Sequence, residues 1–203
     1  QDPIDEIVLK MMMKYNKHEA IIYNTAQMYR HDRLNYLNRL KNIAEKEKFF
    51  IGIKLVRGAY IEQENKSAIK NNYKSPICDS KNLTDTNFNN GASFILSNLN
   101  IFSLFSGTHN EESIYKIIDI MKLNNINKNN SKIWFGQLYG MSDNISFNLA
   151  NKGFNAIKYL PFGPIKEVIP YLIRRAEENT SVKGQTSREL ELIKTELKRR
   201  KSI

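Results

Sequence analysis

The sequence predicts an α/β fold in which parallel strands, covered by helices, belong to a barrel of the (β/α)8 TIM type. Three observations favour this fold. Short apolar segments alternate with amphipathic segments along the 203-residue chain. The apolar segments are hydrophobic throughout, which is typical of strands that are buried on both faces. Polar or aromatic residues follow nearly every apolar segment, as expected where the carboxyl ends of barrel strands converge on one mouth.

Five apolar segments are predicted to be the strands. They lie at 20–26, 49–56, 101–108, 133–139 and 154–162. The intervening segments have helical periodicity, which places apolar residues on one face of a helix. These predicted helices span 33–48, 90–98, 111–123 and 143–151. Two stretches rich in asparagine, 71–90 and 123–132, interrupt the periodicity and are predicted to be loops.

A doubly wound sheet is the alternative to a barrel, because it also alternates strands with helices. Such a sheet commonly has a glycine-rich turn after its first strand, and the chain contains neither GxGxxG nor GxxxxGK[ST]. A barrel of this type closes with eight strands, because an open one leaves unpaired backbone at its edges. We therefore expect N-terminal strands that are missing from this chain to precede Gln1.

The C-terminal part carries a polar stripe on a predicted helix. Tyr171, Arg174, Arg175 and Glu178 follow one another at steps of three, one and three, which aligns them on one helix face. Two guanidinium forks can hold a carboxylate or phosphate through paired hydrogen bonds. The alternative is a solvated face with a surface ion pair. Pro170 either starts this helix or kinks it.

A final helix is predicted at 186–200. We expect two regions, the C-terminal portion of a barrel at 1–182 and a basic helix and tail at 183–203. The second region has seven Lys or Arg against three Glu, within a chain of formal net charge +10. Such charge is typical of proteins that contact nucleic acid or acidic membranes. No RNA-binding motif, zinc finger or helix-turn-helix accompanies it, so we expect no nucleic-acid partner. Peripheral contact with an acidic membrane is the alternative use of this charge.

The sequence gives little support to metal or thiol chemistry. Cys78 is the only cysteine and has no Cys or His neighbour at the spacing of metal ligands. His18, His31 and His109 lie on separate segments. No Ser, Cys or Thr sits in a recognisable nucleophile elbow, which argues against acyl transfer. We therefore predict no metal site and assign no catalytic residue.

Five segments together resemble the proline dehydrogenase family, flavoenzymes that oxidise L-proline. They are IYNTAQMYRHDRL (22–34), KLVRGAYIEQE (54–64), GTHN (107–110), FGQLYGMSD (135–143) and YLPFGPIKEVIPYLIRRAEEN (159–179). The family fold is a distorted eight-stranded β/α barrel that holds FAD across its strand ends. Its last helix lies over the flavin as part of the substrate pocket.

The resemblance implies a role for each matched residue. Substrate binding falls to Arg174, Arg175, Glu178, Tyr159, Tyr171, Leu138 and Tyr60. In this scheme the two arginines hold the proline carboxylate and the tyrosines at 159 and 171 wall the pyrrolidine ring. Cofactor binding falls to Gln27, Lys54, Gly58, Ala59, Thr108, His109 and Asn110. Some members of the family carry arginine where Lys54 stands.

The resemblance also implies hydride transfer from L-proline to FAD, which gives Δ1-pyrroline-5-carboxylate, and a quinone as the electron acceptor. The alternatives are oxidation of hydroxyproline, a barrel that binds phosphorylated ligands, and a non-catalytic basic module that binds nucleic acid or membranes. Family members carry a lysine and an aspartate on early strands that this sequence lacks, so we expect weak FAD retention and little turnover by residues 1–203 alone. The expected location is the cytoplasm or the inner face of the membrane in a bacterium, and the mitochondrial matrix or inner membrane in a eukaryote.

Overall fold

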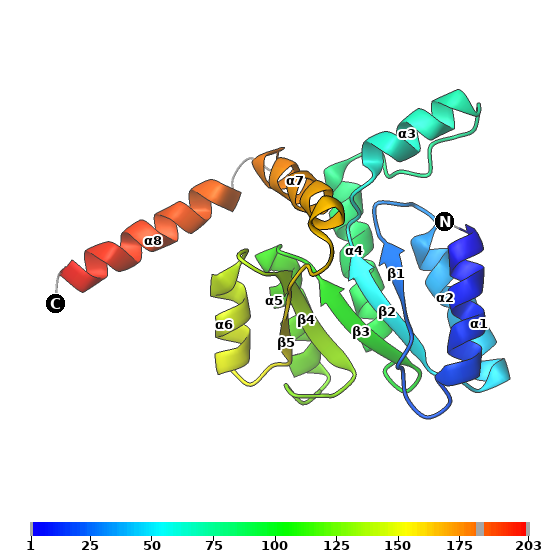
Figure 1. The fold of residues 1–203 in the computed structure, drawn as a ribbon. Coiled ribbons are helices and arrows are strands. Elements are labelled where there is room, and N and C mark those ends of the chain that lie inside the picture. The colour runs from blue at the N-terminus through cyan, green and yellow to red at the C-terminus, as the bar shows by residue number, and fades with distance from the viewer. Residues whose placement is uncertain (1, 182–184, 202–203) are drawn as a thin grey trace. The chain divides into compact units, whose positions relative to one another are not determined.

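The computed structural model describes residues 2–181 and 185–201 (Figure 1). Within these ranges the side chains at 2, 174, 176–181 and 185–189 lie outside the description. The chain divides into two compact units. The first consists of Gln1–Gln137 with Asp143–Lys158, and the second consists of Leu138–Ser142 with Tyr159–Ile203.

A five-stranded sheet has the strand order β1-β2-β3-β4-β5. The strands are β1 Tyr23–Gln27, β2 Ile51–Val56, β3 Phe102–Gly107, β4 Ile133–Leu138 and β5 Ala156–Tyr159. The first four pair in parallel, each with the next strand along the chain. All five strands that the sequence predicts are confirmed, with ends that differ by a few residues.

Helices connect successive strands of the first unit, because parallel strands need a crossover that returns the chain to the starting edge. The helices of this unit are α1 Asp2–Tyr15, α2 Arg33–Glu47, α3 Ile61–Lys70, α4 Lys81–Leu96, α5 Glu111–Leu123 and α6 Asp143–Asn151. The predictions for α2, α5 and α6 are confirmed, whereas α1 and α3 were not predicted. In α3 only Ala68 is buried, so little of this helix packs against the core.

The hydrophobic core packs against one face of the sheet. In β2 the side chains of Ile51, Ile53 and Leu55 are completely buried. In β3 the adjacent residues Phe102 and Ser103 point to opposite faces, and both are buried. Burial of each large apolar side chain stabilises the fold by roughly 1.5–3 kcal/mol. The alternate positions Gly52, Lys54 and Ser103 face the other side of the sheet and are not part of the hydrophobic core, so the expectation of apolar burial on both faces is wrong for β2 and β3.

The asparagine-rich stretch 71–90 is a loop only in its first part, so the loop prediction is wrong from Lys81 onward. The α4 helix begins there because Ser80 caps it, with its Oγ accepting a hydrogen bond from the backbone N–H three residues later at 3.2 Å. Asn87 is buried and donates to two backbone carbonyls in the loop after β1, at 2.7 and 2.9 Å. Tertiary contacts therefore satisfy an amide whose sequence context suggested solvent. The second predicted loop, 123–132, is confirmed beyond the end of α5.

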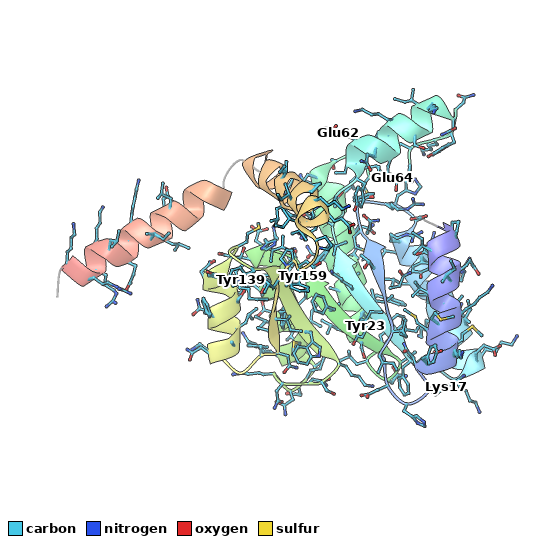
Figure 2. All side chains as sticks on the ribbon, viewed as in Figure 1. Lys17, Tyr23, Glu62, Glu64, Tyr139 and Tyr159 are labelled. Carbon is cyan, nitrogen blue, oxygen red and sulfur yellow. The ribbon has the colours of Figure 1, made fainter. Side chains whose placement is uncertain are left out.

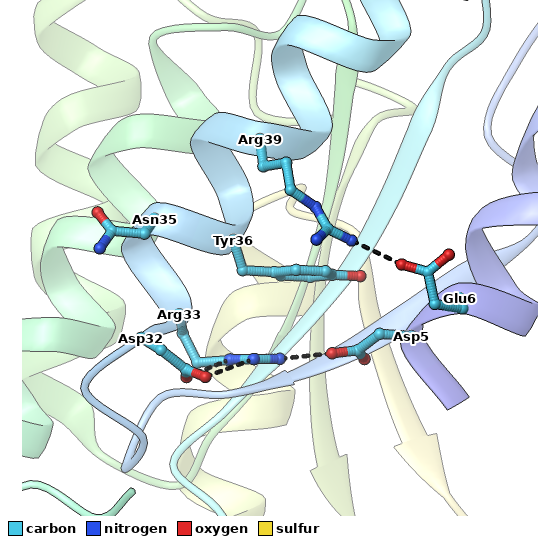
Figure 3. Close-up of a pocket in the computed structure, with 7 residues that line it drawn as sticks. All are labelled: Asp5, Glu6, Asp32, Arg33, Asn35, Tyr36 and Arg39. Atoms are coloured by element: carbon cyan, nitrogen blue, oxygen red, sulfur yellow. Dashed lines mark hydrogen bonds and ion pairs between the residues drawn. The ribbon is translucent and has the colours of Figure 1, made fainter. Parts of the chain in front are cut away.

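A buried ionic network joins α1 to the start of α2 (Figure 3). Arg33 donates to the Asp5 carboxylate at 2.7 Å and also makes two bonds to Asp32, at 2.7 and 2.9 Å. Asn24 on β1 donates to the same Asp5 carboxylate at 2.9 Å, and the Tyr36 ring lies 4.6 Å from the guanidinium carbon. Since Asp5 and Arg33 are only 4% and 3% exposed, each charge depends on its partner.

We predict that Asp5→Ala lowers the free energy of unfolding by about 3 kcal/mol, because it leaves a buried guanidinium short of a partner. The neighbouring Glu6→Ala is a matched control. Glu6 pairs with Arg39 at 2.9 Å, but both side chains are more than half exposed. Its removal is expected to cost less than about 1 kcal/mol. Urea denaturation measures both values, and equal losses would contradict the prediction.

Two helices make up most of the second unit, α7 Ile165–Ser181 and α8 Gln185–Lys201. Two backbone N–H groups of the first turn of α7 donate to the Pro164 carbonyl, at 2.9 and 3.0 Å. Pro170 lies inside α7, so the alternative in which the helix starts at this proline is wrong. The predicted helix at 186–200 is confirmed as α8. The expected boundary between 182 and 183 lies outside the described residues.

Candidate functional site

Parallel pairing brings polar residues from several strands to one edge of the sheet, where the strands end (Figure 1). Gln27 ends β1 and is paired with Val56, the last residue of β2. Lys54 lies two residues before that end, and Thr108 directly follows β3. Gln137 is the penultimate residue of β4. We call the group formed by Gln27, Lys54, Thr108, His109 and Asn110 the strand-end site.

The loop after β3 is held by hydrogen bonds at both sides. The backbone carbonyl of Thr108 accepts from the Gln137 side chain at 3.2 Å, and Gln137 in turn accepts from the Ser146 hydroxyl at 2.9 Å. The side-chain oxygen of Asn110 accepts from the backbone N–H of Ser113 at 2.8 Å and so caps the start of α5. This oxygen already has a structural partner, which the sequence did not indicate.

Arg57 follows β2 and connects the strand-end site to two helices. Its Nε donates to Asp85 at 2.5 Å, and its two terminal nitrogens donate to the hydroxyls of Thr108 at 2.7 Å and Ser113 at 2.9 Å. The guanidinium carbon lies 4.7 Å from the centre of the Phe88 ring. Sequence analysis assigned no role to Arg57. The only signal was a charged residue directly after an apolar strand.

The electrostatics of the strand-end site follow from partial burial. Burial lowers the pKa of Lys54, whose Nζ lies 5.6 Å from the centre of the Phe105 ring. Burial, followed by the nearby charge of Lys158, lowers the pKa of His109 to about 4. The Lys158 ammonium itself bonds to Asp143 at 2.6 Å. At neutral pH His109 is therefore uncharged, and it can donate through one ring nitrogen and accept through the other.

Gly58 has a packing reason to be glycine. Its φ of +120° is rarely adopted by other residues, and an added Cβ would lie 1.6 Å from ring atoms of Tyr29. The resemblance assigns Gly58 and Ala59 to cofactor binding, and that role stays a prediction. Tyr60 stands next to them, just before α3, and is 42% exposed.

In the second unit, several of the predicted substrate residues form one aromatic and cationic group. The rings of Tyr159 and Tyr171 pack edge to face with centres 6.2 Å apart, and the Arg175 guanidinium carbon lies 5.3 Å from the Tyr171 ring centre. The backbone N–H of Tyr139 donates to the Tyr159 carbonyl at 2.9 Å. Tyr139 and Tyr159 are labelled in Figure 2. Leu138 ends β4. The structure thus brings together three of the seven predicted substrate residues.

Two predicted substrate residues, Arg174 and Glu178, belong to α7, but their side chains lie outside the described residues. Among the residues that the structure describes, no group of three or more His, Cys, Asp or Glu side chains could hold a metal ion. Within that same part of the chain, no helix has the length and hydrophobicity needed to cross a membrane.

We predict that Gly58→Ala lowers the free energy of unfolding by about 3 kcal/mol, because it adds a steric clash with Tyr29 to an unfavourable backbone conformation. Gly140→Ala is the control. Gly140 has a φ of +75°, but an added Cβ would meet nothing within 4 Å. Its cost should be about 1 kcal/mol, from the backbone alone. Unfolding of flavin-free protein measures both, and a smaller loss for Gly58→Ala would refute the packing explanation.

His109 should make the protein sensitive to acid. Its pKa is about 4 in the folded protein against a reference value of 6.5, so the unfolded chain binds the proton more readily. Stability should therefore fall as the pH drops from 6.5 to 4. In His109→Gln this contribution is absent, and the melting temperature should fall less over the same range. Thermal unfolding at several pH values tests this, and parallel curves for the two proteins would contradict it.

Comparisons with known proteins agree with these observations. The family model of proline dehydrogenase matches residues 1–188. Proline dehydrogenase 1 of Caenorhabditis elegans, a mitochondrial protein, is 38% identical over 98% of this chain and 33% of its own length. Proline dehydrogenase 2 of Arabidopsis thaliana is 42% identical over 94% of this chain and 40% of its own length. Hydroxyproline dehydrogenase of Xenopus laevis is 35% identical, over 96% and 42% respectively. The chain spans less than half the length of these three relatives.

The fold is also similar to that of a solved structure. The crystal structure of proline utilization A from Bdellovibrio bacteriovorus, inactivated by N-propargylglycine, matches with a TM-score of 0.80 and 25% identity. The match covers 88% of this chain and 18% of that protein. The parallel five-stranded sheet with connecting helices is thus part of a β/α barrel, which confirms the predicted fold class. From the family match and the shared fold, we conclude that the chain belongs to the proline dehydrogenase family.

Proposed function

We propose that the gene-length protein oxidises L-proline to Δ1-pyrroline-5-carboxylate with FAD as its cofactor. By gene-length protein we mean residues 1–203 with any sequence that the gene encodes on either side. The observation that carries the proposal is the family match over residues 1–188. A quinone is the proposed acceptor of the electrons.

The chemistry of the strand-end site fits FAD, which presents mainly hydrogen-bond acceptors and negatively charged phosphates. Lys54 offers an ammonium group, and Gln27, Thr108 and neutral His109 offer uncharged donors. The proposed cofactor residues are Gln27, Lys54, Gly58, Ala59, Thr108, His109 and Asn110. When bound, FAD supplies the two-electron acceptor for the oxidation.

The proposed substrate residues orient a small cyclic amino acid. Arg174 and Arg175 would hold the carboxylate, since a guanidinium can donate two parallel hydrogen bonds to it. The edge-to-face pair of Tyr159 and Tyr171, with Arg175 beside the second ring, supports this role because it places two aromatic rings next to a cation. The set is completed by Glu178, Leu138 and Tyr60. Holding both ends of the substrate lowers the entropic cost of reaching the reactive geometry.

The reaction also requires the loss of a proton. The protonated amine first gives up one proton, and a hydride then leaves the ring carbon that is next to nitrogen on the side away from the carboxylate. The carbon–nitrogen double bond that forms still carries an N–H proton, and its release gives the neutral imine. The amine must be neutral before the hydride leaves, so water or a side chain has to accept that proton first. The arginine pair would contribute by fixing the substrate while this proton departs.

Hydroxyproline is the second candidate substrate. It is favoured by one observation, the 35% identity to the protein named hydroxyproline dehydrogenase in Xenopus laevis. The proposed location is either the cytoplasm, with peripheral contact to the membrane that holds the quinone, or the mitochondrion, as in the names of several eukaryotic relatives. The basic end of α8, with Lys198, Arg199, Arg200 and Lys201, supports contact with an acidic membrane surface.

Purified gene-length protein is expected to carry a flavin absorbance band that L-proline bleaches, and to reduce an artificial electron acceptor when proline is added. Arg175→Lys should raise the KM for proline roughly tenfold, because a lysine cannot make the paired bonds to the carboxylate. Arg39→Lys, which changes an exposed arginine of α2, is the control and should leave KM unchanged.

A parallel assay with hydroxyproline decides between the two substrates through the ratio of kcat/KM values. A protein that binds no flavin and cannot be reconstituted with FAD would refute the proposed function. The 1–203 chain alone serves as a further comparison, with weak FAD retention as the expected result.

A further inference from the structure

Arg57 has a geometry that differs from that of an ordinary surface arginine. Its three side-chain nitrogens donate to three different side chains, Asp85 on α4, Thr108 after β3 and Ser113 on α5. Its guanidinium also packs on the Phe88 ring at 4.7 Å. Because all of these contacts lie within the first unit, they fix the end of β2 to the start of the next β/α segment.

The Thr108 hydroxyl accepts two hydrogen bonds. One comes from Arg57 at 2.7 Å and the other from the backbone N–H of Asn110 at 3.1 Å. A hydroxyl oxygen has two lone pairs and one hydrogen, so both of its acceptor positions are occupied. The hydroxyl can therefore only donate to a further partner. Within the described part of the chain, no acceptor is bonded to that hydrogen.

The guanidinium of Arg57 is paired with a carboxylate of the protein. Asp85 bonds to Arg57 at 2.5 Å and to Lys81 at 2.8 Å. Burial raises the pKa of Asp85, but hydrogen bonds from Lys81 and Arg57 lower it by more, so this carboxylate stays ionised at neutral pH. An arginine whose three nitrogens are already bonded to protein groups is poorly suited to receive an anion itself. Its effect on a ligand should pass through the groups that it holds.

Ser113 extends the same arrangement into α5. Its hydroxyl accepts from Arg57 and donates to Asn89 on α4 at 2.8 Å, while its backbone N–H donates to Asn110 at 2.8 Å. Both neighbours of His109 are therefore held in place. Thr108 is held by its hydrogen bond from Arg57, and Asn110 is held by its capping bond from the Ser113 backbone. The loop that carries the predicted cofactor residues has little freedom to turn away.

We infer that Arg57 is a positioning residue that presents the Thr108 hydroxyl as a hydrogen-bond donor to an acceptor atom of the bound flavin nucleotide, without touching that ligand. The inference rests on the proposed function. It goes further by assigning a role to Arg57, and it fixes the direction of the hydrogen bond that Thr108 makes.

Titration of flavin-free gene-length protein with FAD tests the inference, with quenching of flavin fluorescence as the measure of binding. Thr108→Val keeps the shape of the side chain but removes the donor, and it should weaken FAD binding roughly tenfold, the expected effect of losing one hydrogen bond. Thr108→Ser keeps the hydroxyl and should bind within about twofold of the unchanged protein. Arg57→Lys retains the charge but loses the fixed fork, and it should weaken binding by a similar factor to Thr108→Val.

The double variant Arg57→Lys with Thr108→Val distinguishes positioning from a general structural role. If Arg57 acts through Thr108, the double variant should bind FAD no more weakly than the worse single variant. The long-wavelength flavin absorbance band should shift by the same amount in both single variants. Arg39→Lys, at an exposed ion pair away from the site, is the control and should change neither quantity.

Each result separates the inference from the proposed function. If the unchanged protein binds FAD and oxidises proline but Thr108→Val binds FAD equally well, the inference is wrong and the proposed function stands. Additive losses in the double variant would also overturn the inference. If Arg57→Lys fails to fold, the comparison of Thr108→Val with Thr108→Ser still decides whether the Thr108 hydroxyl donates to FAD, and equal binding by these two variants would overturn the inference. If the unchanged protein binds no FAD, both the inference and the proposed function fall.

Discussion

The parallel pairing of β2 with β3 is the constraint on which the rest of the first unit depends. Parallel strands have their carboxyl ends at the same edge, so residues that are about fifty positions apart in the chain come together there. Arg57 reaches Thr108 for this reason, although one follows β2 and the other follows β3. The same pairing requires helices in the connections, and these helices supply Asp85 and Ser113 as further partners of the arginine. Without this shared edge, neither the hydrogen bonds of Arg57 nor the strand-end site would exist.

Buried polar side chains hold the loops and helix ends around this sheet. Asn16 bonds to the backbone of Ile22, directly before β1, and of Phe50, directly before β2. Asn87 holds the loop after β1. The Asp5 and Arg33 pair joins α1 to α2 in an almost completely buried position. Since a buried polar group without partners costs about 1–3 kcal/mol, each of these groups stabilises the fold only while its partners stay in place. The abundance of asparagine therefore reflects internal hydrogen bonding as well as loops.

The sequence predicted the strands well and some site residues for incomplete reasons. Gly58 was assigned to the cofactor through the resemblance, whereas its φ and the close approach of Tyr29 already require glycine. Asn110 was assigned to the cofactor, and its side-chain oxygen caps α5. Arg57 received no role, because hydrogen bonds to residues 28 to 56 positions away leave no trace in local sequence. A residue type can be recognised from a motif, but its partners depend on the folded chain.

By itself, the sequence determined the alternation of strands and helices, the apolar character of the strands and the resemblance to one enzyme family. These properties are local or periodic, so single segments carry them. Only the tertiary structure decided which polar groups are already bonded to the protein. At Thr108 two donors from different parts of the chain occupy both lone pairs. That outcome depends on the relative position of two strand ends, which no segment of sequence specifies alone.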